Sequence, residues 1–164
     1  RCIYGVIYGI GDTRLGSVVG KSSQEGKRIK AKLFEGLPAL KRLRDNVIVK
    51  TRNQKYLLGL DKRKLIPRSE HSSLNLLIQS CGALIIKMAT VILHKKLKEK
   101  DYDKDTCTMV AHVHDELQLQ CKSAYATEVG ELAVQSIKDA GTHFNLRCPL
   151  DAEFKIGSNW ADTH

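Results

Sequence analysis

The sequence TCTMVAHVHDELQLQ, residues 106–120, predicts a β-hairpin with acidic side chains at its tip. Residues 106–113 and 117–120 alternate between apolar and polar side chains, which favours two strands, and His114-Asp115-Glu116 forms the tight turn between them. Carboxylates at such a tip are held on a rigid support. Hard cations such as Mg²⁺ take one or two carboxylates together with substrate phosphates. The pattern is therefore typical either of a metal site at Asp115 and Glu116 or of an ordinary solvated turn.

Helices are predicted on both sides of this hairpin. Residues 72–98 contain no proline and only one glycine, and their apolar positions nearly encircle the helix axis. We therefore expect a long helix that is buried in its first half. A second amphipathic helix is expected over residues 124–140, and residues 150–156 predict a last strand. Together these elements predict an antiparallel sheet with helices packed on one face.

The N-terminal part of the chain is predicted to be mainly helical. Its first ten residues predict a short apolar helix that is ended by Gly9 and Gly11. Ser22 and Glu25 form a capping box that predicts the start of one helix, and Pro38 starts another. The apolar faces of these two helices comprise Ile29, Leu33, Phe34, Leu37, Leu40, Leu43 and Val47. Residues 56–67 predict two short strands around a basic turn, so the expected fold class is α+β.

The charge of the chain is unevenly distributed. Its 164 residues include 27 Lys and Arg against 18 Asp and Glu, a net charge of +9. Residues 1–100 hold 22 basic and 7 acidic side chains, whereas residues 101–164 hold 5 and 11. The basic excess favours a polyanionic partner such as nucleic acid. The longest apolar run, residues 83–86, is far shorter than the roughly 20 residues of a membrane span, so no membrane partner is expected.

Two histidines beside the acidic tip leave a second metal hypothesis open. His112 and His114 form an H-x-H pair on one face of a strand, which would suit zinc. With Asp115 they would make the site of a zinc hydrolase. The pair lacks a convincing further ligand, and a packed or solvated His112 is the plainer interpretation. His114, at the tip, is the better candidate for a hydrogen bond to a bound ligand.

Polar and aromatic side chains outside the hairpin also have two interpretations. Asn75 and Gln79 are four residues apart on an otherwise apolar helix, where their amides must be satisfied by the core or by a ligand such as a base edge. Arg68 adds a cation just before them. Tyr4 and Tyr8 lie on one side of the opening helix, where they could pack in the core or stack on a nucleobase.

In their order along the chain, these motifs resemble the C-terminal part of the family A DNA polymerases, above all the replicative enzymes of short-tailed bacteriophages. Residues 3–12, IYGVIYGIGD, are similar to the end of motif B on the fingers helix, and residues 113–116, VHDE, resemble motif C. Stretches within residues 59–85 are similar to the palm before motif C, and residues 159–164 to the family's C-terminus. The resemblance implies an incomplete right-hand polymerase fold, with fingers in residues 1–55 and palm in residues 56–164.

The resemblance also implies roles in DNA-templated DNA synthesis by a DNA-directed DNA polymerase. Asp115 would bind the catalytic Mg²⁺ ions, Glu116 would be an accessory acid, and His114 would contact the primer terminus. On the nucleotide side, Tyr4 would lie under the sugar of the incoming dNTP and Tyr8, with Gly9, against the templating base pair. The residues that would line the minor-groove side of the primer-template DNA are Arg68, Asn75 and Gln79.

Several parts of the family pattern would lie before Arg1. They are the Arg and Lys of motif B that grip the triphosphate and the Asp of motif A, so the second metal carboxylate is expected outside this chain. The chain alone is therefore expected not to polymerise nucleotides. A processivity factor bound through an absent thumb and a location in the cytoplasm of an infected bacterium are further expectations.

Two functional alternatives stay open at this point. A non-catalytic basic module that binds nucleic acid would explain the charge, and its binding would not depend on Asp115. The zinc hydrolase built on His112, His114 and Asp115 would instead bind stoichiometric zinc tightly.

Overall fold

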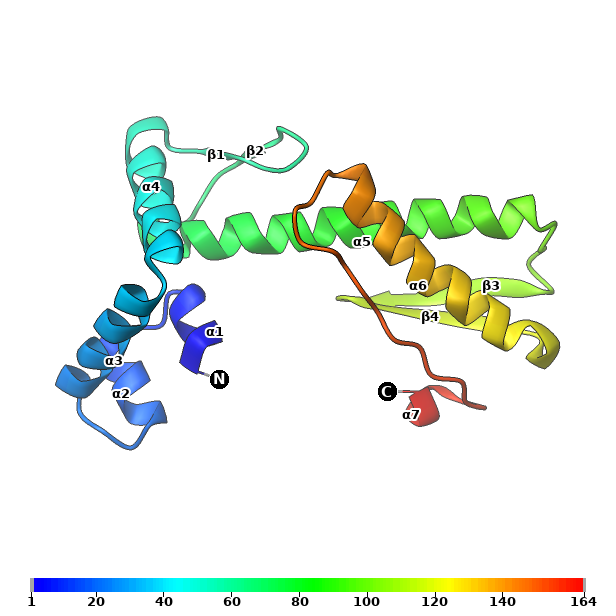
Figure 1. Cartoon of the computed structure of the whole chain (residues 1–164), viewed down its shortest axis with the longest axis horizontal. Helices are drawn as coiled ribbons and strands as arrows, with labels where there is room; N and C mark the ends of the chain where they lie inside the picture. Colours follow the sequence, from blue (N-terminus) through cyan, green and yellow to red (C-terminus); the bar gives the residue numbers. More distant parts are fainter. Residues whose placement is uncertain (1, 164) are drawn as a thin grey trace. The chain divides into compact units, whose positions relative to one another are not determined.

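The chain has the predicted α+β fold. The computed structural model describes residues 2–163 and divides them into two compact units, one ending at Cys81 and one beginning at Gly82. The long helix α5, Ser73–Glu99, begins in the first unit and continues into the second (Figure 1). His164, the last residue of the predicted C-terminal motif, lies outside the described residues. The division at residues 55 and 56 into fingers and palm stays a prediction.

The first unit is mostly helical, as predicted. Its elements before α5 are α1 (Cys2–Ile7), α2 (Asp12–Val18), α3 (Ser23–Gly36), α4 (Pro38–Gln54), β1 (Leu57–Leu58), β2 (Lys64–Leu65) and η1 (Glu70–Ser72). The Ser22 side chain caps α3 by accepting a hydrogen bond from the Glu25 backbone N–H at 3.4 Å. Helix α2 was not predicted, because its seven residues carry little apolar periodicity. It crosses α3 closely, since a Cβ on Gly26 would collide with the backbone carbonyl of Asp12.

Two hydrophobic clusters hold the first unit together. One contains Val6, Leu15 and Phe34, and the other joins Val47 and Leu57 to the start of α5. The prediction that Leu37 and Leu43 lie on buried helix faces is wrong. Their exposed fractions are 42% and 44%. Leu37 lies between α3 and α4, and α4 uses Leu40 and Val47 instead of Leu43 for these clusters.

The second unit packs two helices against one hairpin. Its elements after α5 are β3 (Cys107–Val113), β4 (Glu116–Cys121), η2 (Ser123–Tyr125), α6 (Ala126–His143) and α7 (Trp160–Thr163). Its core joins Leu93 and Leu97 of α5 to Cys107 of β3 and Val129 of α6. Helix α5 thus buries side chains in both halves, Ser73 and Leu74 at its start and Ala89, Leu93 and Leu97 further along. The prediction of burial in the first half is only partly right, because the hairpin and α6 also cover the second half.

The prediction of a last strand over residues 150–156 is wrong. This segment forms no ladder with any described strand and instead packs on α6. A Cβ on Gly130 would collide with the ring of Phe154, and one on Gly141 would lie 3.0 Å from Leu150 Cγ. Two glycines of α6 thus make room for Leu150 and Phe154, although Phe154 and Ile156 stay 41% and 57% exposed.

The length of helix α5 weakens the argument from apolar run length against a membrane span. Together with η1 it is long and apolar enough, by length and composition, to cross a membrane, although its uninterrupted apolar runs are short. Run length alone therefore does not exclude a span. Core helices meet the same criterion when mostly buried, whereas 11% of this apolar window is buried, with Leu93 and Leu97 in the core of the second unit.

An ion pair and a phenol link the segment that follows α5 to α6. The Glu128 carboxylate accepts hydrogen bonds from Lys100 Nζ and, at 2.5 Å, from Tyr102 Oη. Lys100 first and Tyr102 second lower the pKa of Glu128 below its ordinary value of 4.5. The same carboxylate raises the pKa of Tyr102 from 10.0 to about 12.

The stability of the chain should depend on the Glu128 carboxylate at low pH and on the Tyr102 phenol at high pH. A lowered Glu128 pKa contributes stability above the unfolded value near 4.5, and this is lost as pH falls through the folded pKa. A raised Tyr102 pKa contributes stability below pH 10, which is lost as pH rises toward 12. We expect Glu128→Gln to be less stable than the parent at pH 7 and the difference to shrink at pH 3.

Urea unfolding at pH 3, 5 and 7, followed by circular dichroism, measures this dependence. The control is Glu131→Gln, which removes an exposed carboxylate three residues away on the same helix. A Glu128→Gln penalty that is equal at all three pH values would contradict the assignment.

Candidate active site

The acidic tip is a two-residue turn on a twisted hairpin. Strands β3 and β4 pair antiparallel, with Val113 opposite Glu116, so the turn consists of His114 and Asp115 alone. The predicted three-residue turn is therefore corrected, because Glu116 belongs to β4. His114 has a φ of 55°, the left-handed conformation that tight hairpin turns require. His114 and Asp115 are exposed, so the tip presents an imidazole and a carboxylate to solvent.

Glu116 is held by side chains rather than left in solvent. Its Oε1 accepts a hydrogen bond from Trp160 Nε1 at 3.1 Å and another from Gln118 Nε2. Thr163 Oγ1 lies 3.4 Å from Gln118 Oε1, so α7 contacts β4 at two successive outward positions. Sequence reasoning missed this contact because Trp160 is 44 residues from Glu116. Its only signal was the likeness of residues 159–164 to a family terminus.

The side chains at the tip suit a hard cation better than zinc. Between residues 2 and 163 there is no group of three or more His, Cys, Asp and Glu that could hold a metal ion. A zinc hydrolase needs at least three protein ligands, so His112, His114 and Asp115 do not form its site. Mg²⁺ is bound by one or two carboxylates plus substrate phosphates, which Asp115 and its neighbour Glu116 fit.

The aromatic candidates lie together in the first unit. Tyr4 lies in α1 and Tyr8 in the turn that follows it. Both side chains are exposed, with ring centroids 6.5 Å apart, so they do not pack in the core. Gly9 has a φ of 82°, and a Cβ there would lie 2.8 Å from the carbonyl oxygen of His71. This glycine lets the end of α1 approach η1, which brings Tyr8 and Gly9 near the start of α5.

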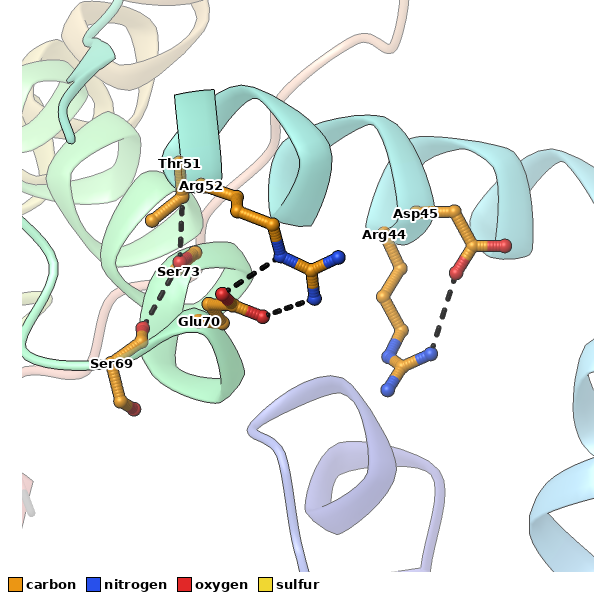
Figure 2. Close-up of polar contacts among 7 residues, drawn as sticks. All are labelled: Arg44, Asp45, Thr51, Arg52, Ser69, Glu70 and Ser73. Atoms are coloured by element: carbon orange, nitrogen blue, oxygen red, sulfur yellow. Dashed lines mark hydrogen bonds and ion pairs between the residues drawn. The ribbon is translucent and has the colours of Figure 1, made fainter. Parts of the chain in front are cut away.

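The segment that carries Arg68 and Asn75 is fixed to α4 (Figure 2). Arg52 donates to both carboxylate oxygens of Glu70, at 3.0 and 2.7 Å. Behind this ion pair, Thr51 Oγ1 donates to Ser73 Oγ at 3.0 Å in a buried contact. The start of α5 is thereby held on the end of α4, so the side chains that follow have a rigid support.

The three predicted DNA-binding side chains of this unit differ in their surroundings. Arg68 and Gln79 are exposed. Asn75 is half-buried, and its Oδ1 is fully buried without a hydrogen-bond partner among the described residues. An unsatisfied buried acceptor is costly, so this amide is a candidate for pairing with a ligand. The structure thus gathers Tyr4, Tyr8, Gly9, Arg68, Asn75 and Gln79 in the first unit and His114, Asp115 and Glu116 in the second.

Comparisons with known proteins agree on one family. The family model for DNA polymerase family A matches residues 1–162. The DNA-directed DNA polymerases of Escherichia phage T7 and Enterobacteria phage T3 are 38% and 37% identical to the chain over 99% of its length and 26% of theirs. DNA polymerase I of Bacillus caldotenax is 28% identical over 97% of the chain and 19% of its own length.

The fold agrees with this assignment. A solved structure described as the POL domain of Pol1 from M. smegmatis in complex with DNA primer-template and dNTP superposes with a TM-score of 0.75. It is 22% identical and covers 92% of this chain and 27% of that one, so it supports the fold alone. The chain spans about a quarter of the length of the phage relatives it matches. With the family model matching nearly its whole length, the chain belongs to DNA polymerase family A.

Proposed function

We propose that this chain carries out part of DNA-templated DNA synthesis, with Asp115 as a metal ligand of the nucleotidyl-transfer site. The observation that carries the proposal is an exposed carboxylate on a two-residue hairpin turn in a chain of DNA polymerase family A. Phosphoryl transfer requires alignment and charge stabilisation rather than covalent chemistry by the protein. A carboxylate at a two-residue turn provides the alignment, because the paired residues Val113 and Glu116 restrict its backbone.

We propose Mg²⁺ as the metal. Asp115 would hold it, with Glu116 close by, and the remaining ligands would be substrate phosphates and a carboxylate outside this chain. When bound there, a divalent ion would supply charge neutralisation at the reacting oxygens. The chain's own part is to present the Asp115 carboxylate at the exposed tip and to place the His114 imidazole beside it, where it would contact the primer terminus.

We propose that the partners are primer-template DNA and dNTPs. Asn75 Oδ1, which has no partner among the described residues, supports this, because the guanine 2-amino group is the donor that the minor groove offers to such an acceptor. Arg68 and Gln79 would flank it on exposed positions, and the basic excess of residues 1–100 suits a polyanion. Tyr4, Tyr8 and Gly9 would form the nucleotide side. A processivity factor and a cytoplasmic location in an infected bacterium belong to the same proposal.

The direct test is a chimeric polymerase in which this chain replaces the matched quarter of the Escherichia phage T7 enzyme. We expect templated primer extension that requires a divalent cation. A chimera that folds and binds primer-template but does not extend it would contradict the proposal and favour a non-catalytic nucleic-acid-binding module.

Tyr4 should set the tolerance for sugars that lack a 3′-hydroxyl. Its exposed phenol can supply a hydrogen bond in place of the missing hydroxyl, so a tyrosine here predicts weak rejection of dideoxynucleotides. We expect Tyr4→Phe in the chimera to raise discrimination against dideoxynucleotides by at least about tenfold. Competitive incorporation of each dideoxynucleotide against its dNTP measures the ratio. Tyr8→Phe is the matched control, and equal discrimination by Tyr4→Phe and the parent would contradict the role of Tyr4.

A further inference from the structure

We propose that Trp160 is a positioning residue, whose indole N–H holds the Glu116 carboxylate in one orientation beside the metal ligand Asp115. This inference rests on the proposed metal-binding role of the hairpin tip. It adds a residue of the C-terminal helix α7 to that site, although α7 is 39 residues beyond the end of strand β4.

The contact between α7 and the hairpin is specific. Trp160 Nε1 donates to Glu116 Oε1 at 3.1 Å, and the same oxygen accepts from Gln118 Nε2. Two donors on one oxygen select one rotamer of a flexible side chain that otherwise samples several. Because Glu116 follows Asp115 directly, this selection also fixes where the second negative charge of the tip lies.

Helix α7 is itself fixed, so it can act as a support. The Asp162 carboxylate accepts hydrogen bonds from the Ser158 backbone N–H at 3.0 Å, Ser158 Oγ at 2.8 Å and Asn159 Nδ2 at 3.0 Å. Thr163 Oγ1 donates to the Trp160 carbonyl at 3.1 Å and lies near Gln118. These bonds close the last turn of the chain on itself and anchor the indole.

The physical effect is on the cation affinity of the tip. A Glu116 carboxylate that is held in place adds a constant favourable field at Asp115, whereas a freely rotating one is partly screened by water. Trp160 is 50% exposed, so the contribution of its hydrogen bond is modest. We expect its loss to weaken divalent-cation binding by about 3- to 10-fold.

Mn²⁺ binding to the 164-residue chain tests the inference without any need for catalysis. The free-ion electron paramagnetic resonance signal reports the dissociation constant for the parent and four variants: Trp160→Phe, Glu116→Gln, their double variant and Asp115→Asn. Trp160→Phe keeps an aromatic side chain and removes the indole N–H donor together with the five-membered ring. We expect it to weaken Mn²⁺ binding by about 3- to 10-fold in the parent and to have no effect in the Glu116→Gln background.

Two further measurements separate positioning from general loss of structure. Trp160→His, which keeps a ring N–H, should restore part of the affinity. Trp160 is the single tryptophan of the chain, so Mn²⁺ should quench its emission in the parent and not in Asp115→Asn. Mn²⁺ affinities are compared only between the parent and variants whose circular dichroism spectra match that of the parent.

The outcomes distinguish this inference from the proposed function. If Asp115→Asn leaves Mn²⁺ binding and quenching unchanged, the metal site itself is refuted, and the role of Trp160 is refuted with it. If Asp115→Asn abolishes binding but the Trp160→Phe and Glu116→Gln effects simply add, the metal site stands and Trp160 does not act through Glu116. A Trp160→Phe affinity equal to that of the parent overturns the inference in the same way.

Discussion

Replacing Asp115 by Asn is expected to lower the rate of templated nucleotide incorporation by about 10³-fold, equivalent to about 4 kcal/mol of transition-state stabilisation. The substitution keeps the size of the side chain and removes the charge that holds the cation. The exposed position of Asp115 at a hairpin turn means that the fold does not depend on it. The loss should therefore appear in catalysis and not in stability.

Single-turnover primer extension by the chimeric polymerase measures this effect, and primer-template affinity is measured separately by fluorescence anisotropy. Affinity should stay within about threefold of the parent, because most of the DNA contacts are expected from the basic first unit. Glu131→Gln, an exposed carboxylate of the same unit, is the control for a change of one charge. Incorporation by Asp115→Asn within tenfold of the parent would show that Asp115 is not a metal ligand.

Replacing Leu93 by Ala is expected to lower the free energy of unfolding by about 2–5 kcal/mol. Leu93 is fully buried at the centre of the second unit, against Leu97, Cys107 and Val129. Truncation removes apolar contacts and leaves a cavity between α5, the hairpin and α6. Because these elements support the acidic tip, the variant should also lose Mn²⁺ affinity as it unfolds.

Urea unfolding of the chain, followed by far-ultraviolet circular dichroism, measures the change in stability. Val91→Ala is the matched control, because Val91 lies two residues away on α5 and is 48% exposed. Its effect should stay within about 0.5 kcal/mol of the parent. A Leu93→Ala effect as small as that of Val91→Ala would mean that this part of α5 is not the core of the unit.

Local patterns in the sequence predicted the elements that depend on near neighbours. The capping of α3 by Ser22 and the near-exact extent of α5 follow from contacts within a few residues. The hairpin was predicted because its two strands are joined by a short turn, and only the assignment of Glu116 to that turn was wrong. The charge distribution and the ordered motifs were enough to predict the family that the comparisons confirm.

The errors arose where a side chain's surroundings depend on distant segments. The pattern of α5 did not show that its second half is covered as well as its start, because the covering hairpin and α6 lie further along the chain. Residues 150–156 have the composition of a strand, but two glycines of α6 let them pack on a helix instead. Burial is decided by which surfaces meet, and sequence periodicity carries no information about the partner.

The candidate site also combines features set by near neighbours with features set by distant segments. The sequence alone placed an acidic pair after an apolar strand and an amide pair on one helix face, because both depend on spacings of one to four residues. Folding then determined that Glu116 is held by Trp160 and that Asn75 keeps a buried oxygen with no partner between residues 2 and 163. These two features depend on segments that are brought together only when apolar surface is buried, so only the tertiary structure could show them.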